Sequence, residues 1–376
     1  MRRIGFLLPT VLGIAAAALG PLASSCSAQE TSPAPEVYRG MCDASAAVAL
    51  DGKTFLAADD ERNVLCVYDA NRAGLPRQEI PWDVHLGIDP REDEHPEADI
   101  EGAARLGGRI YWITSHGRNK KGKWRANRHR FFAITVTSGE NGVVARPFGK
   151  AYRNLIEDLV EDEKLQGLGL AESLRSGEKE VEELAPKEEG LNVEGLCATP
   201  DGKSLLIGFR NPRPDGKALL VPLMNPAAVV AEGQAPEFGP PILLPLGVRL
   251  GGKSFALGIR SIAYSPRHKA YLIAAGPHDT QKVFAVFRWS GRRDQRPALL
   301  AQSTAAIHRL KDFSPEALIV YPEGDAIQLL SDDGALKVKV ASAAECQEGT
   351  FESGACEAKY LLDDKRKTFR SLRIVP

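Results

Sequence analysis

The sequence predicts an all-β protein, a β-propeller of four-stranded blades with a helical insertion, and three observations support this prediction. A unit made of a polar cluster, an apolar strand, a turn and a second apolar strand recurs five times along the chain. The turns between the strands, such as "LDGK" and "PDGK", are hairpin signals. Successive units start at residues 43, 99, 192, 258 and 314, at spacings that suit propeller blades better than a helical solenoid.

Each unit reads as a small antiparallel meander. In chain order the units are "CDASAAVALDGKTFLAADDERNVLCVYD", "DIEGAARLGGRIYWITSHGRN", "NVEGLCATPDGKSLLIGFRNP", "GIRSIAYSPRHKAYLIAAGPHD" and "SPEALIVYPEGDAIQLLSDDG". The closing segment "KTFRSLRIV" is expected to complete the ring together with N-terminal strands, because an unclosed ring would leave a sheet edge exposed. We expect five blades, with six as the alternative.

The longest interval between units, the one between the second and third, could hold a sixth blade, but its composition favours a helical insertion. The apolar residues there follow a helical spacing and fall on one face, namely Leu155, Ile156, Leu159 and Val160. A dense acidic run, "EKEVEELAPKEEG", follows them. We therefore place an insertion at about residues 150–189.

The N-terminus reads as an export signal over residues 1–28, with Arg2 and Arg3, an apolar run and small residues before cleavage after Ala28. Residues 29–36 are then a linker and residues 37–376 the propeller domain. The apolar run is short and contains proline and glycine, so we expect no transmembrane span in the mature chain. The protein is expected to be periplasmic or extracellular. A lipid anchor at Cys26 is the weaker alternative, since "ASSC" only loosely resembles a bacterial lipobox.

The overall charge is close to zero, with 48 basic and 49 acidic residues among 376. Such a balance gives no general attraction for nucleic acid or for an anionic membrane, so nucleic acid is not an expected partner. The expected partner is a small anionic ligand or a protein of the cell envelope.

After removal of the signal, the chain keeps an odd number of cysteines in a compartment where disulfides persist. Cys346 and Cys356 flank one loop near the C-terminus and are the expected disulfide. Cys42 with Cys66 is an alternative pair, and Cys197 reads as a buried thiol within an apolar strand. Without a CxxC pair or a Cys/His cluster, zinc is disfavoured.

Alignment of the five units brings equivalent polar residues together. The third position of each polar cluster is Ser45, Glu101, Glu194, Arg260 or Glu316, and the second strands finish on polar segments such as "SHGRN" and "GFRNP". The first strand of each propeller blade lines the central channel, and it begins near the point where the second strand ends. We therefore expect both sets at one mouth of the channel.

This mouth combines oxygen ligands with cations. Carboxylates from several blades suit Ca²⁺ or another divalent cation, which gives Glu101, Glu194 and Glu316 as metal ligands. Guanidinium and amide groups suit an anion, and the expected anion contacts are Arg118, Arg210, Arg260, Asn119 and Asn211.

A metal beside an anion would be the layout for metal-assisted hydrolysis of a phosphorylated or otherwise anionic small molecule, with His116 as the candidate general acid or base. In the alternative, the arginines and glutamates pair with one another and hold the blades in register. The protein would then be a non-catalytic propeller that binds a ligand or another protein. The sequence does not decide between these two hypotheses.

The segment "GVRLGGKS", Gly247 to Ser254, fits the pattern of a nucleotide phosphate loop. A phosphate loop must lead into a helix, whose N-terminus faces the phosphates. The residues that follow, "FALGIRSIAYS", read as a strand. We therefore expect no nucleotide cofactor.

Several long strings resemble the signature of a bacterial family of unknown function, domain-of-unknown-function family 3616. These strings are "DIEGAA", "IYWITSHGRN", "GLNVEGLCATPDGKSLLIGFRNP", "ALLVPLMNP" and "GIRSIAY", and the resemblance covers about residues 40–290. It implies a propeller-like β-protein and no established activity. The layout more distantly resembles phytase-like esterase propellers, which would imply phosphoester chemistry at the acidic mouth. No catalytic residue carries over from either resemblance.

Overall fold

Strands dominate the described chain, as the alternating apolar runs predict. The computed structural model describes residues 34–59, 61–139, 142–186 and 188–376, together with Met1 and Gly5. The expected cleavage region and Cys26 lie outside the described residues. Within the part of the chain that is described, no helix is long and apolar enough to cross a membrane.

Five four-stranded antiparallel sheets form the body of the described structure. The first contains β2 (Ala44–Ala49), β3 (Thr54–Asp59), β4 (Val64–Asp69) and β5 (Gln78–Pro81). The second contains β6 (Ile100–Leu106), β7 (Arg109–Thr114), β8 (Phe131–Gly139) and β9 (Gly142–Tyr152). The third contains β10 (Asn192–Ala198), β11 (Leu205–Asn211), β12 (Ala218–Leu223) and β13 (Ile242–Leu244). The fourth contains β16 (Gly258–Ser265), β17 (Ala270–Gly276), β18 (Ala285–Trp289) and β19 (Ala298–Leu299).

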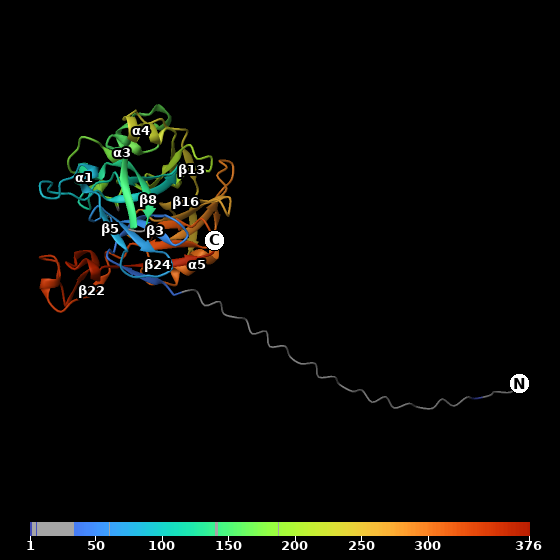
Figure 1. Cartoon of the computed structure of the whole chain (residues 1–376). Coiled ribbons are helices and arrows are strands. Elements are labelled where there is room, and N and C mark those ends of the chain that lie inside the picture. The colour runs from blue at the N-terminus through green and yellow to red at the C-terminus, as the bar shows by residue number, and fades with distance from the viewer. Residues whose placement is uncertain (2–4, 6–33, 60, 140–141, 187) are drawn as a thin grey trace. The chain divides into compact units, whose positions relative to one another are not determined.

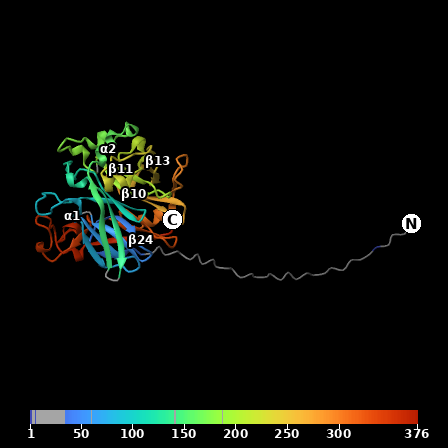
Figure 2. The same ribbon diagram turned by 45° about the horizontal axis from the view of Figure 1, so that its top comes forward.

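The fifth sheet joins the first and the last strand of the described structure. It combines β20 (Pro315–Val320), β21 (Ile327–Ser331), β24 (Thr368–Ile374) and β1 (Glu36–Arg39), and β24 is labelled in Figures 1 and 2. Tyr38 of β1 pairs with Phe369 of β24, and their rings stack with centroids 5.2 Å apart. The closing strand that "KTFRSLRIV" predicts is therefore confirmed, and β24 covers an edge that would otherwise be open.

Apolar side chains join neighbouring sheets all the way round. The first strands of the five sheets, which we call the inner strands, contact one another in a closed ring, in the order β2, β6, β10, β16 and β20. A buried cluster lies at each junction; Leu56 of the first sheet packs with Trp112 of the second, and Leu206 of the third with Ile273 of the fourth. Each sheet thus buries both faces against its neighbours, and the propeller-like fold is confirmed.

Short helices occupy the interval between the second and third sheets. They are α2 (Leu155–Glu161), η2 (Glu163–Leu165), α3 (Leu170–Leu174) and η3 (Glu182–Leu184). Leu155, Ile156 and Leu159 are buried against strands of the second and third sheets, and Val160 packs beside them. The described residues of this interval hold helices where the sequence left room for a sixth blade.

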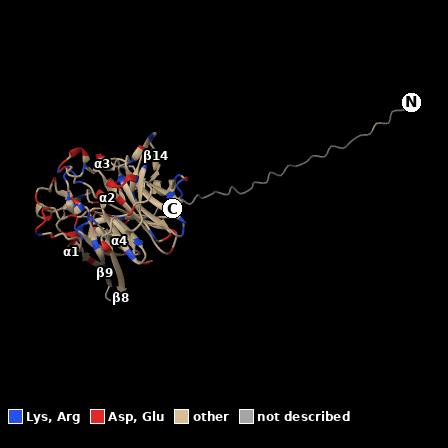
Figure 3. Cartoon of the chain, turned by 90° about the horizontal axis from the view of Figure 1, so that it is seen from above, with Lys and Arg blue, Asp and Glu red and all other residues tan. Residues whose placement is uncertain are grey.

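The remaining elements are short. The other helices are α1 (Asp83–Leu86), η1 (Ala126–Arg128), η4 (Pro214–Gly216), α4 (Pro226–Glu232), α5 (Ala301–His308), η5 (Ala343–Glu345), η6 (Ala358–Tyr360) and η7 (Asp364–Arg366). Acidic and basic residues are interspersed over the face seen in Figure 3.

Two further hairpins lie outside the five sheets. One contains the segment that matches the phosphate-loop pattern, and the other contains the expected disulfide. The segment "GVRLGGKS" forms β14 (Gly247–Leu250) and β15 (Lys253–Ala256), with Gly251 and Gly252 at φ +57° and +79° in the turn. It is a hairpin rather than a phosphate loop. The second hairpin, β22 (Lys337–Lys339) with β23 (Ala355–Glu357), carries the expected disulfide between Cys346 and Cys356. Cys66 and Cys197 are buried thiols.

Candidate functional site

Each inner strand carries one extra residue near its start. The strand pairing shifts by one residue between 44 and 46, 100 and 102, 193 and 195, 259 and 261, and 315 and 317. The residues skipped at these β-bulges are Ser45, Glu101, Glu194, Arg260 and Glu316. A bulge leaves its extra residue without a partner in the ladder and turns its side chain away from the regular alternation. The five positions aligned in the sequence are therefore the same structural position in five sheets.

Four of these five residues line one cavity of about 270 Å³. The wall is strongly polar: six acidic and four basic residues line the cavity, with Phe284 and two prolines as its main apolar surface. The charged residues are Asp99, Glu101, Glu194, Asp279, Glu316, Asp332, Arg128, Arg210, Arg260 and Lys282. The fifth bulge residue, Ser45, donates a hydrogen bond over 3.4 Å to Glu316, which lines the cavity.

A buried ion-pair network occupies one side of this cavity. Oε1 of Glu194 accepts hydrogen bonds from Nη1 of Arg210 at 2.9 Å and from Nη1 of Arg260 at 3.1 Å, and Nε of Arg260 lies 2.9 Å from the other carboxylate oxygen. Arg260 extends further and pairs with Glu316. The network links inner strands of three sheets, and Glu194 is only 2% exposed. Buried charges at this depth are tolerated only when they are paired, so these four groups neutralise one another.

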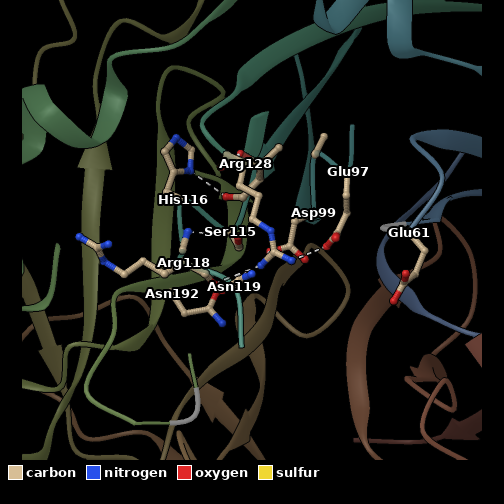
Figure 4. Close-up of polar contacts among 12 residues, drawn as sticks. Glu61, Glu97, Asp99, Ser115, His116, Arg118, Asn119, Arg128 and Asn192 are labelled. Carbon is tan, nitrogen blue, oxygen red and sulfur yellow. Dashed lines mark hydrogen bonds and ion pairs between the residues drawn. The ribbon is translucent and has the colours of Figure 1, made fainter. Parts of the chain in front are cut away.

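A second ion-pair group lies at the start of β6 (Figure 4). Arg128 pairs with Asp99 at 2.8 Å and with Glu97 at 2.5 Å. Asp99 has a φ of +60°, a left-handed conformation that aspartate tolerates better than most residues. It immediately precedes β6, so this conformation sets the direction in which the strand and its bulge begin.

Glu101 differs from the other charged residues of the cavity. In the described structure its carboxyl makes no hydrogen bond and no ion pair, although the cavity leaves it partly accessible. Burial, together with the charges of Asp99 and Glu194, raises the pKa of Glu101 well above its usual range. These effects favour the protonated form of Glu101, and a protonated carboxyl can both donate and accept a hydrogen bond.

Asn192, beside Glu101 in the cavity wall, also has an unused polar atom. Its amide nitrogen donates to Glu194 at 3.1 Å, which orients the side chain. Its Oδ1 is buried without a hydrogen-bond partner among the described residues. A buried polar atom left without a partner costs about 1–3 kcal/mol, so a donor at this place would be favourable.

Two buried aspartates, Asp43 and Asp332, form a coupled pair of carboxyl groups, and Asp332 lines the cavity. Asp43 and Asp332 lie opposite each other in an isolated β-bridge. Burial and the adjacent Asp332 raise the pKa of Asp43 well above its usual range. Burial alone would raise the pKa of Asp332 as well, but the hydrogen bonds from Asp43 and from the Gly334 amide lower it. These opposite shifts favour the ionised form of Asp332, which lines the cavity.

His116, the residue expected as general acid or base, lies outside the cavity wall. Its Nδ1 donates to the carbonyl of Thr114 at 2.8 Å, and its buried Nε2 has no hydrogen-bond partner in the described structure. The ring of His129 lies 5.4 Å away. Burial lowers the pKa of His116 to about 4, and burial, then His116 and Arg130, lowers the pKa of His129 to about 2. Both histidines are neutral and packed.

Three of the five expected anion contacts serve the scaffold. The Arg118 guanidinium donates to four backbone carbonyls, those of Gly122, Leu174, Arg175 and Glu178. In Figure 4 its side chain extends away from the Arg128, Asp99 and Glu97 group. Asn119 closes its own turn by accepting from the amides of Lys121 and Lys123. Asn211 donates to the carbonyls of Glu189 and Gly190.

The structure thus brings together Glu101, Glu194, Glu316, Arg210 and Arg260, and it places His116, Arg118, Asn119 and Asn211 elsewhere. Glu101, Glu194 and Glu316 are also the expected ligands of a metal ion. Among the described residues, no three His, Cys, Asp or Glu side chains are arranged to hold a metal ion. Calcium there stays a prediction, and its binding would require Arg260 to leave Glu194 and Glu316.

Sequence reasoning missed Asn192 and Arg128 as residues of the cavity. Asn192 is two positions before the aligned Glu194, and the repeat alignment contained the information needed to find it. Arg128 belongs to "NKKGKWRANRHR", a basic segment that the sequence favours as a solvated hairpin loop, with an anion-binding loop as the alternative. No sequence signal distinguishes Arg128 from the other basic residues of that loop.

The sequence also matches a family model over residues 43–325, a region that contains all five inner strands. The family is described as "Protein of unknown function (DUF3616)". The chain belongs to this family. The matched region of the family includes every charged residue of the cavity except Asp332. The chain matches no curated protein.

Several solved structures resemble this chain at low sequence identity. The PQQ-bound aldose sugar dehydrogenase of Streptomyces coelicolor has 10% identity and a TM-score of 0.39, covering 92% of this chain and 100% of its own. A putative oxidoreductase (glucose dehydrogenase) of Thermus thermophilus has 13% identity and a TM-score of 0.40, covering 91% and 100%. A Bacteroides thetaiotaomicron protein of unknown function has 8% identity and a TM-score of 0.38, covering 91% and 76%. These scores are too low to transfer an activity.

Proposed function

We propose that the charged cavity binds a small, hydroxyl-rich molecule of low net charge. The observation that carries the proposal is that Glu101 and Asn192 both line the cavity, and that the Glu101 carboxyl and Oδ1 of Asn192 make no hydrogen bond among the described residues. Hydroxyl groups donate and accept hydrogen bonds, so they satisfy a neutral carboxyl and an amide oxygen at once. A ligand site with a few convergent polar groups in a concave wall is the usual arrangement for small molecules.

The charge balance of the wall favours a ligand without a large charge of its own. Six carboxyl groups face four cations in the cavity wall, and the raised pKa of Glu101 favours the uncharged form of that carboxyl, so the two signs nearly balance. Arg210 and Arg260 already hold Glu194, so a phosphate would have to displace a buried carboxylate. That exchange would leave a buried charge without its partner, which costs several kcal/mol. This is the non-catalytic alternative of the sequence hypotheses, with the ligand class now narrowed.

The test is a thermal-unfolding screen of the full chain with three kinds of additive. Neutral polyols such as myo-inositol and D-glucose are expected to raise the melting temperature in proportion to binding. Inorganic phosphate and CaCl₂ at the same concentration are expected to have little effect. A stabilisation by CaCl₂ or phosphate alone would favour the metal-assisted hydrolase instead, and no stabilisation by any additive would favour a structural network.

A second candidate function is hydrolysis of the bound molecule without a metal. It is favoured by two carboxyl groups that line one cavity and whose pKa values are shifted in opposite directions, upward for Glu101 and downward for Asp332. Such a pair is the arrangement used for general acid and base catalysis. The Asp332 carboxylate would accept a proton from a water molecule while the oxygen of that water attacks the substrate carbon. Glu101 would donate its proton to the departing oxygen.

This second candidate has its own readout. Release of 4-nitrophenol from 4-nitrophenyl glycosides and from 4-nitrophenyl phosphate reports hydrolysis directly. Turnover of a glycoside is expected to fall about 100-fold or more in Asp332→Asn, whereas ligand binding is retained. Absence of turnover for wild-type protein with every glycoside that binds would leave binding as the function.

A further inference from the structure

A second cavity, of about 260 Å³, lies at the opposite ends of the same inner strands. Three consecutive residues of every inner strand line it, namely 47–49, 103–105, 196–198, 262–264 and 318–320. The charged cavity is lined by residues near the start of four of these strands, whereas this one is lined by residues toward the end of all five. Between the two, the strands approach closely: a Cβ on Gly102 would meet the Leu196 Cβ at 3.0 Å. The two cavities are therefore separate sites.

The side chains that line this second cavity are mostly apolar. Alanine, valine, leucine and isoleucine side chains form most of it, and Tyr264 adds an aromatic ring. Water in such a space finds few hydrogen-bonding partners, and an apolar molecule gains by replacing it. A cavity of 150 Å³ holds a benzene molecule, so about 260 Å³ suits a molecule of roughly ten non-hydrogen atoms.

One charged residue interrupts this apolar wall. Arg105, near the end of β6, is the only charged side chain among the described residues that line the cavity. Its Nη2 donates to the carbonyls of Ala49 and Leu50, both at 3.3 Å, which holds the guanidinium across the junction with the first sheet. Its other nitrogens make no hydrogen bond in the described structure.

No carboxylate neutralises Arg105. It takes part in no ion pair among the described residues, although the charge of Asp51 reaches it. The Asp51 carboxylate is already engaged, since its Oδ1 accepts from the amides of Lys53 and Thr54 at 2.7 Å each. The guanidinium therefore keeps donors free for an anion, and a carboxylate matches its planar fork best.

We propose that this apolar cavity binds a small hydrophobic carboxylate, with the apolar part among the inner strands and the carboxylate on Arg105. The ligand class follows from charge complementarity: a neutral apolar molecule would leave the guanidinium unused, and a cation would be repelled. The site is independent of the charged cavity, because it shares no residue with it.

The test compares 3-phenylpropionate with its uncharged analogue 3-phenylpropanamide by isothermal titration calorimetry on the full chain. Both probes are of a size that fits, and they differ in the carboxylate alone. The carboxylate is expected to bind about tenfold more tightly to the wild-type protein, because its hydrogen bonds to Arg105 are charge-assisted. In Arg105→Gln that preference is expected to disappear, while the amide binds as before.

Two further variants locate the site. Arg249→Gln changes an exposed arginine on β14 that does not line the cavity, and it is expected to leave both affinities unchanged. Ala103→Leu adds volume to the wall and is expected to weaken both probes, with circular dichroism confirming that it folds. The proposal is overturned if neither probe binds the wild-type protein, or if the preference for the carboxylate survives in Arg105→Gln. Glu101→Leu is expected to leave binding of both probes intact, which separates this site from the charged cavity.

Discussion

Arg260 and Glu194 form a buried ion pair across two neighbouring sheets, with Nε and Oε2 2.9 Å apart. Both residues are the extra residue of a β-bulge, in β16 and β10 respectively. The same distortion, repeated in five sheets, points polar side chains into one cavity where regular alternation would have packed them between the sheets. The bulges are thus the link between the sequence repeat and the site.

Loss of Glu194 should destabilise the fold strongly. In Glu194→Gln, Arg210 and Arg260 stay buried with a neutral partner, and we expect the free energy of unfolding to fall by about 3–5 kcal/mol. Denaturant-induced unfolding measures this change. Asp294→Asn, which breaks an exposed pair with Arg292, is the matched control and should leave the free energy of unfolding nearly unchanged. Equal effects of the two substitutions would argue against a buried network.

Acid should destabilise the protein through His116 and His129. Their folded-state pKa values, about 4 and about 2, lie below the unfolded value of 6.5. The stability that neutral histidine contributes is present above pH 6.5 and is lost as the pH falls, because the unfolded chain then binds protons that the folded chain does not. Each histidine should cost about 2 kcal/mol between about pH 7 and pH 5.

His129→Phe isolates half of this effect. Neither ring nitrogen of His129 has a hydrogen-bond partner in the described structure, and its ring stacks on Trp124, so phenylalanine should be tolerated. At pH 8 the variant and wild-type protein should have similar stability. At about pH 5 the variant should be more stable by about 2 kcal/mol. A stability difference that does not change with pH would contradict the assignment.

Glu101 should have the opposite pH dependence. Its folded-state pKa is raised, so the stability it contributes is present below its unfolded pKa of about 4.3 and is lost as the pH rises above that value. Glu101→Gln should therefore match wild-type stability near pH 4 and exceed it increasingly at higher pH. Unfolding curves at a series of pH values test this, with Glu323→Gln, an exposed glutamate, as the control. Wild-type protein that gains stability relative to Glu101→Gln as pH rises would contradict a protonated Glu101.

Arg118 should stabilise the helical insertion. Arg118→Met removes a guanidinium that bonds four carbonyls, three of them within residues 174–178, and should lower the free energy of unfolding by about 3 kcal/mol. Hydrogen exchange should accelerate first in residues 170–184. Lys120→Met, which changes an exposed neighbour, should leave exchange unchanged. Uniform acceleration over all five sheets would show that Arg118 is not specific to the insertion.

The repeat made most of the fold and the core of the site predictable. The alternation of apolar and polar residues predicts the strands and turns. Alignment of the five units places Glu101, Glu194 and Arg260 at one equivalent position. Alignment could not show which charges pair, since that depends on the spacing between neighbouring sheets. Arg118 and His116 were misleading because their partners are backbone carbonyls, which leave no trace in the sequence.

The most direct test of the central claim is calorimetric binding of the polyol that stabilises the protein most, measured for wild-type, Glu101→Gln and Glu101→Leu. A neutral amide replaces a neutral carboxyl closely, so Glu101→Gln should keep its affinity within about threefold, whereas Glu101→Leu should lose about tenfold or more. Glu323→Leu should bind as wild-type does. If Glu101→Leu binds the polyol as tightly as wild-type protein, the charged cavity is not its binding site.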